Sequence, residues 1–258
     1  MPPSHKNTSS ELYGAEIIQL YGADPREIPL YGMTQAARYL KIAPATLRSW
    51  VKGRKYPVGR YGEVRYFKPI ITPPTPNLLS FTNLMEAHVL SGMRRIEGVP
   101  FHKVRRALEY IEREMPSPHP LVDYSFETDG VDLFVRHLGM LISASNQGQC
   151  VIAEVVSTYL RRIKRDPNLS AVRLIPFLRP HQQSLKSEVD ISEPESVMID
   201  PLVSFGRPVL IGTGIPTDVL ADRFNAGEDI EDLARDYGIE TAQVQKALRY
   251  ESPAREAA

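Results

Sequence analysis

The stretch MTQAARYLKIAPATLRSWVKGRKYP, Met33 to Pro57, decides how the N-terminal part of this 258-residue chain is interpreted. It predicts two short helices around a tight turn, followed by a basic segment. Thr34 is a favourable N-cap for the first helix, and Pro44 suits the first position of the second helix, where a missing N–H costs nothing. Apolar residues then recur at helical spacing on the inward faces: Ala37, Leu40, Leu47, Trp50 and Val51. This pattern is typical of a helix-turn-helix whose second helix enters a DNA major groove.

Basic side chains dominate the outward side of the second helix and the segment after it. Between Arg48 and Lys68 the chain has seven basic residues and one acid, Glu63, a local net charge of +6 in a chain of zero formal charge. Such an excess attracts phosphate, and GRKYPVGRYGEVRYFKP is typical of a wing. The predicted DNA-contacting residues are Thr46, Arg48, Ser49, Lys52, Arg54, Lys55, Arg60, Tyr61, Arg65, Tyr66 and Lys68. A non-binding helical domain with solvated charges is the alternative; we favour DNA binding because motif, wing and charge coincide.

The overall composition is that of an ordinary soluble protein. Hydrophobic residues make up 42% and charged residues 24%, and no apolar run reaches the roughly 18 residues that a membrane-spanning helix requires. The N-terminal MPPSHKNTSS lacks an apolar signal core, so we expect residues 1–26 to be a flexible tail, and the protein to be cytoplasmic with no membrane contact. Cys150 is the only cysteine, and His88 and His102 lack ligand partners at plausible spacing. We therefore expect no metal site and no cofactor.

Composition shifts along the chain divide it into segments. The winged helix-turn-helix domain is predicted to cover residues 27–116, including a second helical pair that breaks at Gly98–Pro100. A small α+β middle domain follows over residues 117–181. It is predicted to have an Asp129-Gly130 hairpin, a helix from Val151 to Arg165 and a strand in AVRLIPF. Residues 182–196 are predicted to be a linker. The fold class is α+β and mostly helical.

A separate module is predicted over residues 197–258. It combines a strand-like piece at Val209–Ile211 with three helices, the first capped by Thr217 or Asp218. The apolar residues of the second and third helices fall at helical spacing: Ile230, Leu233, Ala234, Tyr237, Val244, Ala247 and Leu248. The last two helices resemble a helix-turn-helix, but Thr217 to Ala258 contains ten acids and five bases. A duplex would repel this charge, so the module is expected to meet a protein. GTG, residues 212–214, predicts a tight turn rather than a phosphate loop.

The motifs FGRPVLIGTGIPT, FNAGEDIEDLARDYGI and ALRY resemble a domain-of-unknown-function family found in bacterial antitoxins encoded beside PIN-like nuclease toxins. The resemblance extends upstream through the helix-turn-helix, LLSFTNLMEAHVL, KVRRAL, HPL, ETDG and GQ. Over residues 27–252 the chain resembles VapB-type antitoxins with a MerR-like winged N-terminus. The resemblance implies an antitoxin that represses its own promoter on double-stranded DNA and silences a PIN-like ribonuclease toxin. It does not imply catalysis by the chain itself.

Two expectations about partners follow from that resemblance. A PIN nuclease concentrates carboxylates around metal ions, so Arg or Lys side chains could block it. The candidates for this role are Arg207, Arg223 and Arg249, and Tyr250 is a further predicted toxin contact, although exposed arginines often only solubilise a surface. We also expect a homodimer, because bacterial operators mirror two-fold proteins. The main alternative is a MerR-like transcription regulator that responds to a small effector and has no toxin partner. An enzyme is less favoured, because no catalytic constellation can be assembled from sequence order.

Overall fold

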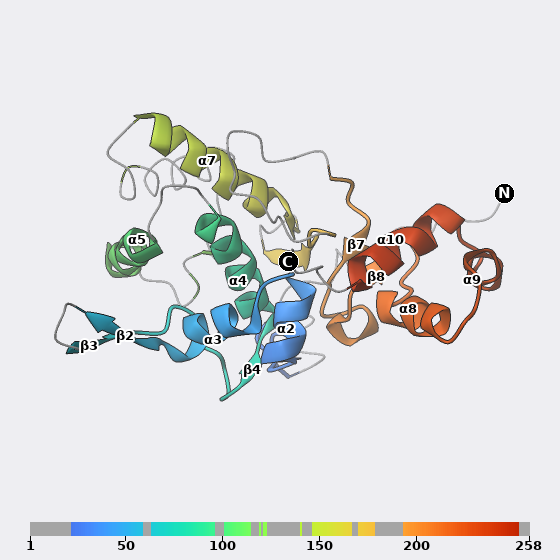
Figure 1. Cartoon of the computed structure of the whole chain (residues 1–258), viewed down its shortest axis with the longest axis horizontal. Coiled ribbons are helices and arrows are strands. Elements are labelled where there is room, and N and C mark those ends of the chain that lie inside the picture. Colours follow the sequence, from blue (N-terminus) through green and yellow to red (C-terminus); the bar gives the residue numbers. More distant parts are fainter. Residues whose placement is uncertain are drawn as a thin grey trace. The chain divides into compact units, whose positions relative to one another are not determined.

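The computed structural model describes residues 22–58, 63–95, 101–114, 119, 121–122, 140, 146–166, 170–178 and 193–252. The chain forms two compact units (Figure 1). The N-terminal unit comprises Glu27–Arg161 and Gln183–Val189, and the C-terminal unit comprises Met1–Arg26, Arg162–Gln182 and Asp190–Ala258. Helices combine with short antiparallel strand pairs, which confirms the α+β class. In the part of the chain that the structure describes, no helix is long and apolar enough to cross a membrane.

The helix-turn-helix of the N-terminal unit consists of α2 (Met33–Tyr39) and α3 (Pro44–Lys52). Pro44 occupies the first turn of α3, as predicted. Thr34 does not cap α2: the helix begins at Met33, and the Gln35 side chain accepts the Gly32 N–H at 3.3 Å. Gly32 belongs to β1 (Tyr31–Gly32), which pairs antiparallel with β4 (Leu78–Leu79). This pairing brings the segment before α2 beside the segment before the next long helix.

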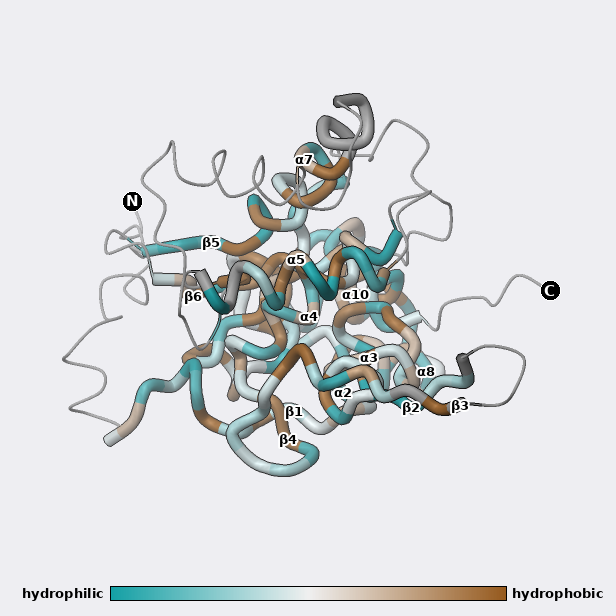
Figure 2. Tube along the Cα trace, turned by 90° about the vertical axis from the view of Figure 1, so that its left-hand side faces the viewer, coloured by the Kyte–Doolittle hydropathy of each residue, from teal (hydrophilic) through white to brown (hydrophobic). Residues whose placement is uncertain are grey.

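Helix α4 (Phe81–Arg94) is the buried centre of this unit, because every residue from Phe81 to Met93 is buried. Ser80 begins it with a reciprocal cap, since its hydroxyl accepts the Asn83 N–H at 3.2 Å and its N–H donates to the Asn83 side chain at 3.1 Å. Helix α5 (Phe101–Glu114) and helix α7 (Asn146–Arg161) complete the unit. Hydrophobic and hydrophilic segments alternate along α7 (Figure 2). Its Tyr159 ring lies 4.8 Å from the ring of His88 on α4.

In the C-terminal unit, a strand pair follows α7 in the chain: β5 (Ile163–Arg165) and β6 (Ala171–Leu174). The helix predicted to run to Arg165 therefore ends at Arg161, and the strand predicted in AVRLIPF is confirmed. Ile163 fits the apolar spacing of a helix, but its pairing with Leu174 places it in a strand. Leu174 also exchanges backbone hydrogen bonds of 2.9 and 2.8 Å with Ile199, so β6 is joined to the start of the predicted module.

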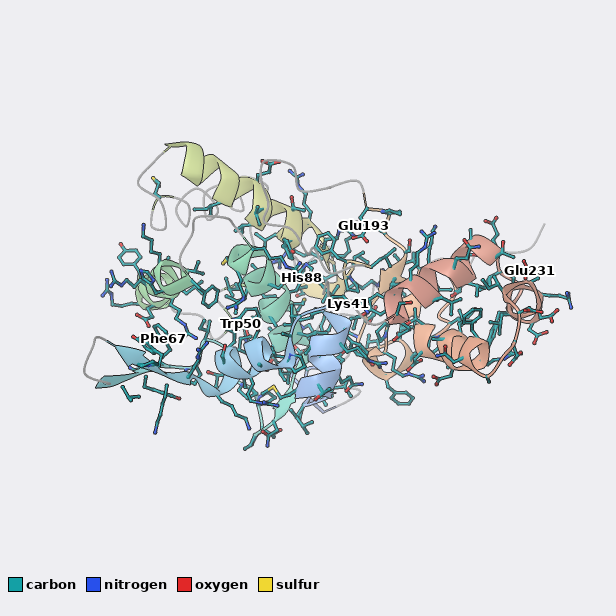
Figure 3. All side chains as sticks on the ribbon, in the orientation of Figure 1. Lys41, Trp50, Phe67, His88, Glu193 and Glu231 are labelled. Atoms are coloured by element: carbon teal, nitrogen blue, oxygen red, sulfur yellow. The ribbon has the colours of Figure 1, made fainter. Side chains whose placement is uncertain are left out.

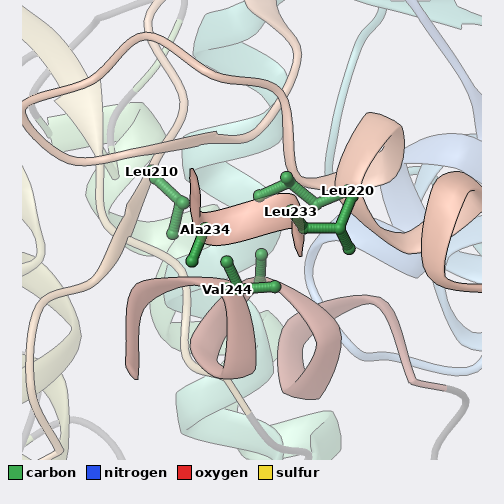
Figure 4. Packing of buried hydrophobic residues seen from close by; sticks show 6 residues of the cluster. Leu210, Leu220, Leu233, Ala234 and Val244 are labelled. Carbon is green, nitrogen blue, oxygen red and sulfur yellow. The ribbon is translucent and has the colours of Figure 1, made fainter. Parts of the chain in front are cut away.

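The module itself contains the strand pair β7 (Val197–Met198) and β8 (Val209–Leu210), followed by α8 (Thr217–Asn225), α9 (Ile230–Tyr237) and α10 (Thr241–Glu251). Pro216, rather than Thr217 or Asp218, precedes the first helical residue as its cap. The predicted apolar stripes of α9 and α10 pack with Leu210 and Leu220 into one core (Figure 4). The stripe residues Leu233, Ala234, Val244 and Ala247 are buried in it, and Ile230, Tyr237 and Leu248 are partly buried against it. GTG is a turn, in which Gly212 and Gly214 have φ values of 82° and 69°.

Several sequence predictions fall on other parts of the chain. Residues 1–21, the Asp129-Gly130 hairpin and residues 179–192 lie outside the described residues. The predicted domain boundaries stay a prediction; in the structure α7 belongs to the N-terminal unit, whereas β5 and β6 belong to the C-terminal unit.

Candidate nucleic-acid interface and C-terminal module

Helix α3 has one face in the core and one face in water. Leu47 and Trp50 are fully buried, and Val51 is almost so, while Arg48 and Lys52 are exposed on the other side. The Trp50 ring stacks on Phe101 of α5 with centroids 5.9 Å apart (Figure 3 labels Trp50). This anchoring leaves the helix a rigid outer face with two cationic side chains, as a DNA-reading helix requires.

Two further predicted contact residues on α3, Thr46 and Ser49, are less accessible than Arg48 and Lys52. The Ser49 hydroxyl donates a 2.7 Å hydrogen bond to the Thr46 carbonyl oxygen, and both side chains are half-buried. The Ser49 hydroxyl oxygen keeps its ability to accept a hydrogen bond, but its proton is directed along the helix. Arg48 and Lys52 are therefore the α3 side chains best placed to meet a phosphate or a base edge.

A hairpin of β2 (Arg54–Val58) and β3 (Glu63–Phe67) follows α3 directly and forms the predicted wing. On one face, the Tyr56 and Phe67 rings stack with centroids 3.9 Å apart. On the other face, Lys55 lies opposite Tyr66, and Val64 lies opposite Pro57; Val64 and Tyr66 are 63% and 54% exposed. Since partners in a strand pair share a face, the wing has a packed side and an open side.

The predicted cations of the wing have different places. Arg54, Lys55 and Lys68 are exposed. Arg65 lies in β3 opposite Tyr56, while Arg60 and Tyr61 lie outside the described residues. Tyr66 also has a structural role, because its hydroxyl donates to the Lys52 carbonyl oxygen at 2.7 Å and so ties the wing to the end of α3.

Gly53 is the joint between α3 and the wing. Its φ is 74° and its ψ is −179°, and a Cβ at this position would lie 2.4 Å from the Phe67 carbonyl oxygen and 2.4 Å from the Tyr66 hydroxyl. Only glycine suits both this backbone conformation and this close approach. In the segment that follows the wing in the chain, the N–H groups of Ile70 and Ile71 both donate to the Trp50 carbonyl oxygen, at 2.7 and 3.1 Å. Helix and wing are thus held together at both ends.

Arg105 on α5 fixes the packed side of the wing, a role that the sequence analysis missed. Its guanidinium donates to the Lys68 carbonyl oxygen at 2.5 Å and lies over the Phe67 and Phe101 rings, 4.9 and 5.8 Å from their centroids. Arg105 is only 7% exposed, and burial lowers its pKa from the ordinary value. The available signal was its spacing of four residues from Phe101, which places it on the apolar side of the helix.

A half-buried histidine joins the start of the N-terminal unit to α4. His119 lies 3.3 Å from a carboxylate oxygen of Glu27 and 3.3 Å from one of Glu86. Burial alone would lower the pKa of His119, but the hydrogen bonds to the two carboxylates raise it to about 10. The imidazolium therefore links the start of the unit to α4 as a charged group.

In the C-terminal module, the four predicted toxin-contacting residues lie in different settings. Arg207 pairs with Asp218, with Nε 3.2 Å from a carboxylate oxygen. Arg223 hydrogen-bonds to Glu228 at 2.7 Å and to Asp236 at 2.6 Å; the bond to Glu228 contributes most to raising the pKa of Arg223 above its ordinary value. These two arginines are thus engaged within the module.

The other two candidates contrast with each other. Arg249 on α10 is exposed and makes no ion pair with any residue that the structure describes. Tyr250 is only 1% exposed and packs with Leu178 and Val197. Its ring therefore has a packing role that joins α10 to β7 and to the segment that follows β6. Of the four, Arg249 alone offers an exposed cation without an intramolecular carboxylate among the described residues.

Comparison with known proteins finds one family over the helix-turn-helix and wing and another over the C-terminal module. Residues 29–108 match a family described as "Putative DNA-binding HTH domain", and residues 197–250 match "Protein of unknown function (DUF433)". The Mycobacterium tuberculosis protein named "Putative antitoxin VapB45" is 30% identical over 244 residues, covering 86% of this chain and 93% of that protein. A second protein of that organism, "Uncharacterized protein Rv2308", is 23% identical over 227 residues, covering 87% and 90%.

A solved structure shares the fold. The crystal structure of Rv2018 from Mycobacterium tuberculosis superimposes with a TM-score of 0.57 at 22% sequence identity, covering 86% of this chain and 98% of that one. At this identity the likeness speaks for the fold alone.

Proposed function

This chain belongs to the family of the protein named VapB45, and on that premise we propose that it is an antitoxin that represses its own promoter and neutralises a PIN-like ribonuclease toxin. The N-terminal unit would bind the DNA and the C-terminal module would bind the toxin. The protein would act in the cytoplasm as a non-enzymatic regulator. The proposal is supported most directly by the anchored α3 with its exposed cations, on a chain whose C-terminal module is acidic.

For DNA, we propose that the exposed face of α3 enters the major groove while the wing lies along the backbone, in the manner of MerR-like winged domains. Arg48 and Lys52 come from the helix, and Arg54, Lys55 and Lys68 come from the wing. Because Gly53 and the Trp50 carbonyl hold helix and wing together, the two would dock as one body. Binding through phosphates predicts a steep dependence on salt concentration.

For the toxin, we base the proposed contacts on charge complementarity. A nuclease that cleaves RNA must attract phosphates around a carboxylate-rich metal site. The acidic faces of the module complement the cationic surroundings of such a site, and an exposed arginine could reach the carboxylates themselves. Arg249 is the candidate for this second contact, because its guanidinium is exposed.

We further propose that the chain is a homodimer on DNA. One helix and one wing cover only a short site, and a two-fold protein would read half-sites about 10 base pairs apart. Sedimentation of the free protein and of its promoter complex measures this; a monomer in both states at micromolar concentration contradicts the proposal.

The decisive test is to co-express the full chain with the product of the adjacent gene and measure RNA cleavage by that product. Full-length protein is required, because deletion from residue 197 onward would cut the Leu174–Ile199 hydrogen bonds and remove Tyr250 from Leu178. We expect inhibition by the wild-type chain and inhibition weakened roughly tenfold or more by Arg249→Glu.

A matched control sits on the neighbouring helix. Arg235 is also exposed, but it pairs with Asp232 within α9, so Arg235→Glu should inhibit like the wild type. A wild-type chain that neither binds nor inhibits the adjacent product would refute the toxin half of the proposal. Retained promoter binding with thermal stabilisation by a small molecule would then support the effector-responsive regulator instead.

A further inference from the structure

One aromatic side chain of the C-terminal module stands almost entirely in water. Phe205 is 88% exposed, the highest value among the large hydrophobic side chains of the described residues. It lies in the short turn η2 (Ser204–Gly206), between β7 and β8. Burial of a phenylalanine ring is a main source of stability in proteins and interfaces, and this ring contributes very little of it to the fold.

The backbone at this position is as unusual as the exposure. Ser204, Phe205 and Gly206 have φ values of 48°, 56° and 70°, three consecutive residues in the left-handed region. Glycine adopts this region freely and asparagine tolerates it, whereas an aromatic residue is strained there. Phe205 thus combines a strained backbone conformation with an apolar ring that is exposed to water. Strained residues of this kind persist where the geometry serves a purpose.

The turn is held in place on both sides. The N–H of Gly206 donates to the Val203 carbonyl oxygen at 3.0 Å, and the Ser204 hydroxyl donates to the Gly214 carbonyl oxygen at 3.2 Å. Arg207, the next residue, is paired with Asp218 at the start of α8. The Phe205 ring is therefore presented on a fixed turn, and a partner would not have to order the turn before binding.

We propose that Phe205 is the anchor through which the C-terminal module docks onto its toxin, filling an apolar pocket that has a basic rim. The identity of the partner rests on the proposed function. A basic rim follows from charge, because residues 197–252 contain ten acids and five bases. The same charge opposes a second copy of the module as the occupant, since two such surfaces repel each other. A ribonuclease, which must hold RNA phosphates, supplies cationic surface.

The test distinguishes an effect on toxin binding from an effect on stability, because it uses a substitution that the backbone at position 205 tolerates. Phe205→Asn removes the ring but tolerates positive φ, so the thermal midpoint should stay the same or rise. Toxin affinity, measured by calorimetry on full-length protein, should fall about thirtyfold or more, as for an aromatic hot spot. Phe205→Tyr, which keeps an aromatic ring, should stay within a few-fold of wild type.

Phe224→Asn is the matched control, because Phe224 is 41% exposed on α8 with ordinary helical backbone. It should bind within about threefold of wild type. Equal affinity of Phe205→Asn and wild type would overturn the inference. So would a Phe205→Asn variant that loses its self-association while keeping toxin affinity, because the occupant would then be a second copy. Failure of the wild-type chain itself to bind the toxin would instead refute the proposed function.

Discussion

Replacing Gly53 by alanine should disrupt the junction between α3 and the wing. Gly53 has a φ of 74° and a ψ of −179°, a region that is essentially restricted to glycine and costs other residues about 1–3 kcal/mol. The added Cβ would also lie 2.4 Å from the Phe67 carbonyl oxygen, which belongs to β3 and cannot move alone. Together these effects predict a loss of about 3 kcal/mol in the free energy of unfolding.

Thermal and urea unfolding of the full-length variant measure this loss. For a unit of this size, about 3 kcal/mol corresponds to a fall of roughly 10 °C in the unfolding midpoint of the N-terminal unit. Gly32→Ala is the control, because Gly32 lies in the same unit, has negative φ and has no atom within 4 Å of an added Cβ. We expect it to change the midpoint by no more than about 2 °C.

Promoter binding should follow stability in this pair. Gly53→Ala moves the wing relative to α3, so its affinity for the promoter should fall at least tenfold at temperatures where the variant is still folded. A Gly53→Ala protein that melts within 2 °C of wild type would refute the reasoning, because the close approach to Phe67 would then be dispensable. Unchanged promoter affinity in a destabilised protein would refute the claim that helix and wing dock as one body.

Two further predictions concern charged groups of the N-terminal unit. Lys52→Ala should weaken promoter binding and reduce the slope of log affinity against log salt concentration by about 0.9, the value for one phosphate contact. Arg105→Met should weaken binding and leave that slope unchanged, because Arg105 positions the wing through the Lys68 carbonyl and does not contact phosphate. Equal slopes in the two variants would contradict these different roles. For His119, the folded pKa of about 10 lies above the ordinary value of 6.5, so its stabilisation is complete below about pH 6.5 and is lost as the pH rises toward 10. The thermal midpoint of the N-terminal unit should fall over that pH range, and it should fall less steeply in His119→Asn. His102→Asn is the control, because His102 is exposed, and it should match wild type. Parallel midpoint curves for wild type and His119→Asn would contradict a stabilising charge on His119.

Local sequence patterns predicted the elements well because they record local forces. Trp50 and Leu47 share a helical face by spacing alone, and Pro44 marks the helix start by its missing N–H, so both were placed correctly. The core stripes of the C-terminal module followed from the same periodicity. The strand at Ile163 was missed because its pairing with Leu174 overrides an apolar spacing that also fits a helix.

Long-range partners are what the sequence did not disclose. Arg105 and Lys68 are 37 residues apart, and Arg223 meets an acid 13 residues away, and neither separation has a periodic signature. The resemblance and the expected charge of the partner suggested Arg207, Arg223, Arg249 and Tyr250 as contacts, but the structure gives each a different environment, because their intramolecular partners are not visible in the sequence. Phe205 was overlooked because positive φ at a non-glycine residue leaves no mark on composition.

The two N–H groups that converge on the Trp50 carbonyl oxygen have an evolutionary consequence. Together with Gly53, they join helix and wing through the Trp50 carbonyl and the backbone of Ile70 and Ile71, which are contacts that use no side chain of the proposed DNA surface. The side chains at exposed positions such as Arg48 and Lys55 take no part in these contacts. Relatives can therefore diverge in the operator they recognise by changing those side chains alone, while the geometry that delivers them stays the same.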